Sequence, residues 1–170
     1  MILRPRAFAL VLALAALPAM AAPHAPTLAV ASLSDLTTVP DHPYDENANA
    51  DQAVDAAFAK ARAEHKRVML DLGGNWCGDC RVLAGIMDLP KMRRFLEAHY
   101  VLVSVDVGRF NKNLQVPARF GITERLVGVP SVLVADPDGK LVNRNDIFAL
   151  ADARSMTPQA IADWLAQWAS

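Results

Sequence analysis

The chain has 170 residues, 53% of them hydrophobic, and its 17 basic and 18 acidic residues leave a net charge of −1. This length and composition suit one globular domain with a full core. The nearly balanced charge gives no support to nucleic-acid or membrane-surface binding, because both favour a basic surface. We therefore expect no nucleic-acid partner.

The N-terminus has the pattern of an export signal. Two arginines precede an unbroken apolar run at residues 7–17, and the small residues Ala19 and Ala21 follow it. This pattern predicts a signal peptide over residues 1–21. The run is shorter than the ~20 residues of a membrane-spanning helix, which argues against an uncleaved anchor. We therefore expect a periplasmic or secreted protein, not inserted in the membrane after cleavage, in a compartment where disulfides persist.

Residues 22–43 are rich in Pro, Ala, Ser and Thr and show no sustained period. They are expected to form a linker or flexible arm before a domain over residues 44–170. Within that domain, apolar residues recur at three- and four-residue spacing over 48–65, which predicts an amphipathic helix. Residues 68–72 are a short apolar run ended by two glycines, and this is typical of a buried strand.

The remaining elements continue the alternation of helices and strands. Helices are predicted over 78–87, 91–99, 114–120 and from 157 onward, and strands over 100–106, 129–135 and 140–143. The last two strands flank an Asp-Pro-Asp-Gly turn, so they should form a hairpin. This order predicts an α/β fold with a central mixed sheet of four or five strands and helices on both faces.

The only two cysteines, Cys77 and Cys80, stand where the strand at 68–72 gives way to the helix at 78–87. In a first helical turn, positions i and i+3 have Cβ atoms about 5–6 Å apart, whereas a disulfide prefers about 3.5–4.5 Å. A small adjustment therefore lets the pair cycle between dithiol and disulfide. So short a loop would stabilise the fold little, so we expect redox chemistry rather than a structural staple.

The position of each cysteine on the helix predicts its role. The helix N-terminus favours negative charge, so Cys77 is expected to supply the attacking thiolate. Cys80, one turn further, should be more buried and act as the resolving thiol that breaks the mixed disulfide. Gly78 would let a substrate backbone approach closely. The Asp79 carboxylate should oppose the neighbouring thiolate and make the reduced protein a better reductant.

The Trp-Cys-Gly-Asp-Cys segment at residues 76–80, placed after a buried strand, resembles the active site of the thioredoxin superfamily. It is most similar to that of exported bacterial thioredoxin-like proteins. Asp71, six residues before Cys77, and the segment Val129-Pro130-Ser131 agree with the resemblance, as does the order of elements from 54 to 168. The resemblance implies a thioredoxin-like fold and a thiol–disulfide oxidoreductase.

The resemblance also implies roles for individual residues. Asp71 would be a general base or proton relay for Cys80, with a pKa raised by burial. Trp76 would shield the Cys77–Cys80 disulfide and shape the docking surface. Pro130 would be cis, and its segment would face the cysteines and pair with the substrate backbone. The substrate-binding residues expected are Trp76, Gly78, Asp79, Val129 and Pro130.

Three features depart from the family pattern. Ser104 stands where many thioredoxins carry a lysine paired with the buried aspartate. Asp79 replaces a frequent proline, and this should change the redox potential. Residues 123–127 look like an insertion next to the Pro130 segment, and we expect this insertion to lie beside the active site, where it could select partners.

Two other classes of function compete with this one. Tetrahedral zinc takes four ligands, and the two cysteines supply two, while the four histidines lie in the predicted linker or at helix ends. We therefore expect no bound metal and no cofactor, with a thioredoxin-fold metallochaperone or a non-catalytic binding module as the alternatives. The favoured function is reduction or isomerisation of disulfides in exported proteins, with a membrane thiol-reducing protein as electron donor.

Overall fold

The computed structural model describes residues 23–169, so the predicted signal peptide over residues 1–21 lies outside the described residues. Within residues 23–169, the centre of the fold is a mixed sheet of three strands in the order β2-β1-β3. The central strand β1 (Arg67–Gly73) pairs in parallel with β2 (Tyr100–Asp106) and antiparallel with β3 (Ser131–Ala135).

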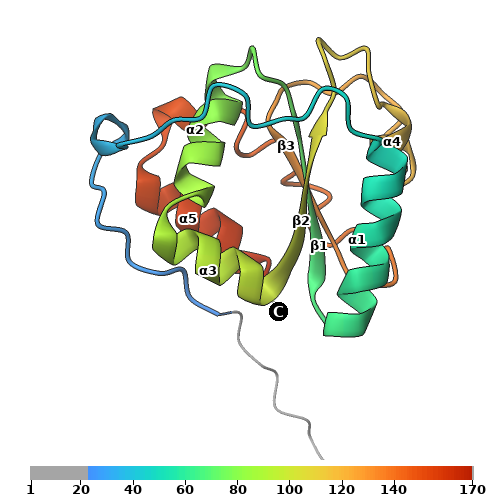
Figure 1. The fold of residues 1–170 in the computed structure, drawn as a ribbon, viewed down its shortest axis with the longest axis horizontal. Helices are drawn as coiled ribbons and strands as arrows, with labels where there is room; N and C mark the ends of the chain where they lie inside the picture. The colour runs from blue at the N-terminus through green and yellow to red at the C-terminus, as the bar shows by residue number, and fades with distance from the viewer. Residues whose placement is uncertain (1–22, 170) are drawn as a thin grey trace, which may run out of the picture.

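Helices cover both faces of this sheet. The helix α1 (Ala50–Glu64) packs on one face, and α2 (Gly78–Met87), α3 (Pro90–His99) and α5 (Pro158–Gln167) pack on the other, as Figure 1 shows. Each face has its own apolar cluster. Both clusters draw on the strands, of which β1 and β3 are buried almost throughout, whereas β2 at the edge of the sheet exposes Leu102. The near-continuous apolar sequence of the strands is the expected result.

The helix ends follow the signals in the sequence. The Asn49 side chain accepts a hydrogen bond from the Gln52 N–H and so begins α1, two residues later than predicted. The Thr157 side chain caps α5 in the same way, with Pro158 in the first helical position. The helix expected at 114–120 is the short α4 (Gln115–Ala118), which lies next to α1.

The predicted fourth strand at 140–143 does not form as a strand, so the expectation of four or five strands is wrong for residues 23–169. The hairpin turn is present, but the returning chain makes only one bridge, between Ala135 and Leu141. After one further backbone bond, from the Val142 N–H to the Val134 carbonyl, the Asn143 side chain takes over: its Oδ1 accepts from the Val134 N–H and its Nδ2 donates to the Val132 carbonyl, both at 2.8 Å. A side-chain amide thus satisfies the edge of β3 without a further strand.

Residues 23–43, the described part of the predicted linker or arm, run along α2 and α3 (Figure 1). The Leu28 N–H donates to the Gln159 side chain, the Arg81 guanidinium donates to the Pro40 carbonyl, and Lys91 donates to the Thr27 carbonyl, each at 3.0 Å. This part of the chain is therefore attached by contacts along its length. The domain boundary at residue 44 stays a prediction.

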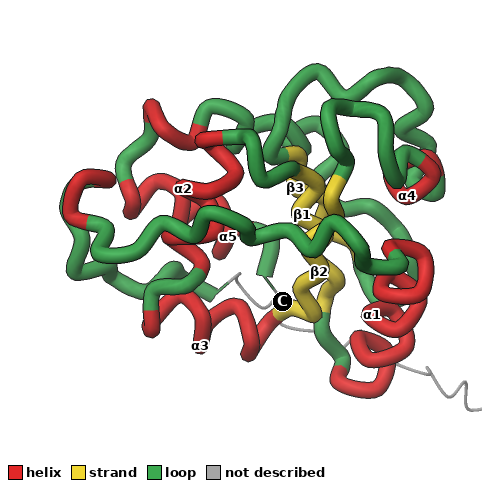
Figure 2. The backbone as a smooth tube through the Cα atoms, turned by 45° about the horizontal axis from the view of Figure 1, so that its top comes forward, coloured by secondary structure: helices red, strands yellow, loops and turns green. Residues whose placement is uncertain are grey.

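Loops account for most of the chain between β2 and β3 and between β3 and α5, as Figure 2 shows. Both loop regions contribute residues near the two cysteines, described below. Within residues 23–169, the helices are too short or too polar to cross a bilayer.

Candidate active site

Cys77 and Cys80 form a disulfide at the start of α2, with their Cα atoms 5.3 Å apart. Cys77 is the N-cap of the helix, and its Sγ accepts a hydrogen bond from the Cys80 N–H at 3.1 Å. This contact is the one that would stabilise a thiolate after reduction. Cys80 is fully buried, while Cys77 keeps 4% of its surface exposed. The structure thus pairs these two cysteines, and Cys80 is the more buried of the two.

The segment before β3 faces the first cysteine. The Val129–Pro130 peptide bond is cis, as the resemblance implied. The Val129 carbonyl oxygen lies 3.3 Å from Cys77 Sγ, and both Val129 and Pro130 are buried. The structure therefore brings this segment, 52 positions away in the sequence, next to the sulfur that is the more accessible of the two.

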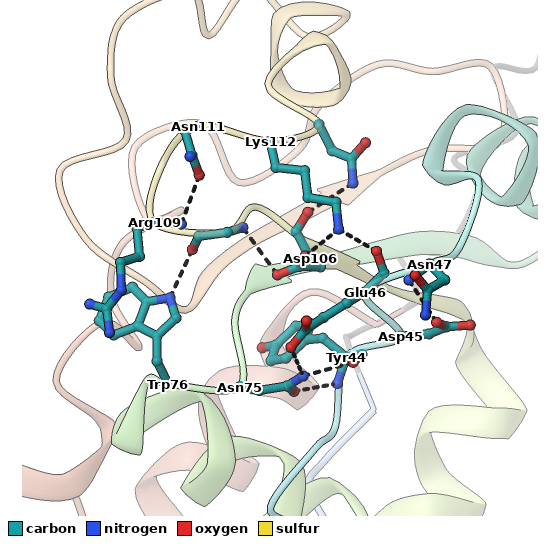
Figure 3. A network of polar contacts seen from close by, with 12 residues as sticks. Tyr44, Asp45, Glu46, Asn47, Asn75, Trp76, Asp106, Arg109, Asn111 and Lys112 are labelled. Atoms are coloured by element: carbon teal, nitrogen blue, oxygen red, sulfur yellow. Dashed lines mark hydrogen bonds and ion pairs between the residues drawn. The ribbon is translucent and has the colours of Figure 1, made fainter.

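Trp76 lies at the surface beside Cys77 rather than in the core, with 44% of its surface exposed. Its indole N–H donates to the Gly108 carbonyl at 2.8 Å, and the Arg109 guanidinium lies 4.8 Å above its ring (Figure 3). A side chain on Gly74 would place Cβ 2.8 Å from the indole nitrogen, so this close approach needs glycine. The ring is thereby held in a fixed position next to the disulfide.

Asp79 has a cationic partner that reasoning from the sequence did not anticipate. It is 8% exposed, and its carboxylate forms an ion pair with Arg154 at 3.1 Å and accepts from the Arg154 backbone N–H at 2.9 Å. A Cβ on Gly78 would lie 3.3 Å from the same guanidinium. The effect of Asp79 on a Cys77 thiolate is therefore offset by a nearby cation. Sequence reasoning missed Arg154, which is 75 positions from Asp79 and belongs to no motif.

Asp71 is buried in β1 and is 1% exposed. Its Oδ2 accepts a hydrogen bond from the Tyr44 hydroxyl at 2.9 Å, and its Oδ1 is buried with no hydrogen-bond partner among the described residues. Burial raises the pKa of Asp71 from its ordinary 3.8 to about 7, and the Tyr44 hydrogen bond acts in the opposite direction. Sequence reasoning anticipated the raised pKa but missed Tyr44, whose only signal is an aromatic residue among polar ones just before α1.

The predicted insertion at 123–127 reaches the site through an aromatic contact. The Arg125 guanidinium lies 5.0 Å from the centre of the Phe110 ring, and this ring meets Trp76 edge-on with centroids 6.0 Å apart. Leu126 is buried, whereas Val127 is 80% exposed. The segment is therefore anchored beside Trp76 and presents an apolar side chain to solvent.

The described residues form no cluster of three or more His, Cys, Asp or Glu side chains that could hold a metal ion. Two thiolates, released by reduction of the disulfide, are the softest donors at this site. Residues 23–169 thus provide no preformed tetrahedral zinc site around Cys77 and Cys80.

Comparison with known proteins agrees with this geometry. Residues 49–137 match the model of a family described as thioredoxin-like. A thioredoxin from Alicyclobacillus acidocaldarius is 31% identical over 80 residues, which are 47% of this chain and 68% of that protein. The thiol:disulfide interchange protein DsbD 1 of Pseudomonas aeruginosa is 32% identical over 97 residues, which are 55% of this chain but only 15% of that protein.

A solved structure gives the same result for the fold. The crystal structure of a disulphide isomerase from Xylella fastidiosa superimposes with a TM-score of 0.68 and 37% sequence identity, covering 74% of this chain and 95% of that one. The sequence match, the shared fold and the disulfide at the start of α2 lead to one conclusion. The chain belongs to the thioredoxin-like family, with Cys77 and Cys80 as its Cys-x-x-Cys pair.

Proposed function

We propose that the protein reduces or isomerises disulfides of exported proteins through a dithiol–disulfide cycle of Cys77 and Cys80. The observation that carries the proposal is the placement of Cys77: it caps α2, keeps a small exposed surface and faces the cis-proline segment, while Cys80 is closed behind it. A visiting disulfide can reach only the first sulfur, and the second is held one helical turn away to complete the exchange.

The cycle balances as two thiol–disulfide exchanges. The Cys77 thiolate attacks one sulfur of the substrate disulfide, so that bond breaks, a mixed disulfide forms and the released substrate thiolate takes a proton. Cys80 then loses its proton to Asp71 and attacks Cys77 Sγ, which breaks the mixed disulfide and releases the second substrate sulfur as a thiolate. This thiolate takes a proton from solvent, and Asp71 returns one to solvent. The substrate gains two electrons, and the protein becomes the disulfide present in the structure.

Reducing work requires a source of electrons. In an oxidising compartment, a donor dithiol must return two electrons to Cys77–Cys80 after each turnover, and we assign this role to a membrane protein with a reactive dithiol. The names of two similar proteins, a thiol:disulfide interchange protein and a disulphide isomerase, favour exchange over strong oxidation. The missing histidine between the cysteines points the same way. Export, and with it the periplasmic or secreted location, depends on the predicted signal over residues 1–21.

A trapping experiment tests the cycle. Reduced Cys80→Ser protein is mixed with insulin, whose disulfides serve as the probe, and the products are separated without reductant. We expect a mixed disulfide at Cys77, because the resolving thiol is absent, and release of the insulin chain by dithiothreitol. Cys77→Ser is the matched control and should trap nothing. The proposal fails if the wild-type protein does not reduce insulin and Cys80→Ser captures none of it.

Two further measurements separate the proposal from its alternatives. Refolding of a scrambled disulfide protein distinguishes isomerisation from simple reduction, because only isomerisation restores native pairing without net consumption of reductant. Titration of the reduced protein with Cu(I) tests the metallochaperone alternative: tight binding without insulin turnover would favour it. Fractionation of cells that express the full chain tests export, and protein retained in the cytoplasm would contradict it.

A further inference from the structure

Tyr44 is a buried tyrosine that no motif in the sequence explains. It is 2% exposed, and its hydroxyl donates to Asp71 Oδ2 at 2.9 Å inside the protein. Burial and the nearby Asp71 carboxylate raise the pKa of Tyr44 well above its ordinary value. The hydroxyl therefore keeps its proton and acts on Asp71 only as a donor.

The active-site loop holds the backbone of Tyr44 in place, as Figure 3 shows. Asn75 Oδ1 accepts from the Tyr44 N–H at 3.0 Å, and Asn75 Nδ2 donates to the Tyr44 carbonyl at 3.0 Å. The same amide nitrogen donates to the Glu46 side chain at 2.8 Å. Asn75 lies two residues before Cys77, so the segment that carries Tyr44 is fixed to the loop that carries the redox pair. Two hydrogen bonds to one backbone unit define its position better than packing alone.

Gly73 shows how close Tyr44 lies to the resolving cysteine. A Cβ built on Gly73 would overlap the Tyr44 hydroxyl and would lie 2.9 Å from Cys80 Sγ. The hydroxyl and the resolving sulfur are therefore neighbours across this glycine. Asp71 Oδ1 meanwhile has no hydrogen-bond partner among the described residues. One carboxylate oxygen thus accepts a hydrogen bond, and the other has a free lone pair. This arrangement lets the carboxylate accept a proton.

Among the groups around Tyr44 and Asp71, the Tyr44 hydrogen bond is the main polar interaction that acts on the Asp71 carboxyl. Asp106 is the second carboxylate whose charge acts on Tyr44, and Lys112 neutralises it through an ion pair at 2.8 Å. Directly opposite Asp71 in the sheet stand the uncharged Ser104 on β2 and Val132 on β3. No lysine contacts the carboxylate, so a neutral hydrogen bond takes the place of an ion pair in the part of the chain that the structure describes.

We propose that Tyr44 is a positioning residue that holds the Asp71 carboxyl beside Cys80 as an ionised proton acceptor. The inference depends on the proposed function, because it gives Asp71 the Cys80 proton during resolution of the mixed disulfide. A hydrogen bond to the carboxylate favours its ionised form against the burial that opposes ionisation. Tyr44 therefore keeps the acceptor usable near neutral pH.

Tyr44→Phe tests this role, because it removes the hydroxyl and keeps the buried ring. The Asp71 carboxyl is titrated by carbon-13 NMR in the oxidised protein, a readout that needs no turnover. We expect the Asp71 midpoint to move upward by about one pH unit. Tyr100→Phe is the matched control: Tyr100 is also buried, and its hydroxyl donates at 2.7 Å to the Leu165 carbonyl, away from Asp71. That control should leave the midpoint unchanged.

Turnover gives a second readout with its own signature. Insulin reduction by Tyr44→Phe should fall about fivefold at pH 7 and recover by pH 9, where Asp71 is ionised even without the hydroxyl. In an Asp71→Asn background, Tyr44→Phe should add nothing further. An unchanged Asp71 midpoint in a folded Tyr44→Phe protein overturns the inference, as does an equal loss of activity at every pH. If the wild-type protein shows no turnover, the proposed function fails, and the NMR titration still decides the role of Tyr44.

Discussion

The two sulfurs of the disulfide lie in two different surroundings. On the Cys77 side, Trp76 and the Arg154 guanidinium that pairs with Asp79 are exposed to solvent, while the cis-proline segment is buried against Cys77. On the Cys80 side, the Asp71 carboxyl and the Tyr44 hydroxyl are buried and form a hydrogen bond at 2.9 Å away from water. Charges in the first region are screened by water, whereas those in the second are not.

This difference predicts which changes matter most. A mutation on the buried side should have a large effect on protonation and stability, because a low dielectric strengthens every polar interaction and offers no water to replace a lost partner. A mutation on the exposed side should have a small effect, because water and flexible side chains compensate for it. The predictions below compare the two sides.

Asp71→Asn should produce the largest effect, on the pH dependence of stability. The folded-state pKa of Asp71, about 7, lies above its ordinary 3.8, so its contribution to stability is fully present below about pH 3.8 and has been lost once the pH has risen through about 7. The full loss is on the order of 4 kcal/mol. Urea unfolding of the oxidised proteins should therefore show the free energy of unfolding of Asp71→Asn rising relative to that of the wild type from pH 4.5 to pH 8. A constant difference across this range would contradict the assignment.

The same substitution should slow the chemistry although it stabilises the fold. Without a carboxylate to take the Cys80 proton, resolution of the mixed disulfide should slow about 100-fold at pH 7. Stopped-flow measurement of a single turnover with a small disulfide separates this step from the first attack by Cys77. The first step should keep its rate, and equal slowing of both steps would show that Asp71 acts on the whole site.

Sequence reasoning found the residues that are close together in the chain and missed those whose partners are distant. The Cys77–Cys80 pair was predictable because three-residue spacing at a helix start is local information. The cis bond before Pro130 came from the family resemblance and not from spacing. Tyr44 and Arg154 were missed because their partners are 27 and 75 positions away, and no periodicity links them.

The error in the sheet has an equally specific cause. The Asp-Pro-Asp-Gly turn correctly predicted that the chain reverses after β3. A hydrophobic pattern cannot show that Asn143 will bond to β3 through its side chain instead of its backbone, since both arrangements satisfy the same N–H and carbonyl groups. Two of the strands that were predicted correctly, β1 and β3, are buried almost throughout, and there the apolar run alone determines the element.

Alanine substitutions at two glycines, one on each side of the disulfide, allow a direct comparison of the two sides. Gly73→Ala should cost about 1–3 kcal/mol, because its Cβ would overlap the Tyr44 hydroxyl and crowd Cys80. Gly78→Ala should change stability by less than about 0.5 kcal/mol, because its Cβ would meet only the mobile end of Arg154. Chemical denaturation of both oxidised variants provides the measurement. A larger loss for Gly78→Ala would reverse the comparison.

Arg154→Gln should have the smallest effect and acts on the exposed side. It leaves the Asp79 carboxylate without its cation, so a negative charge now opposes the Cys77 thiolate two residues away. The pH midpoint for alkylation of Cys77 by iodoacetamide should rise by about half a unit, since Arg154 is largely exposed and its charge is screened.

The double variant Arg154→Gln/Asp79→Asn should return the midpoint close to the wild-type value, because the pair is neutral in both proteins. Asp79→Asn alone should lower it, since the cation is then unopposed. If all three variants react with the same midpoint, the ion pair does not influence Cys77. The sequence-based expectation that Asp79 makes the protein more reducing would then fail together with its correction, because neither charge would reach the sulfur.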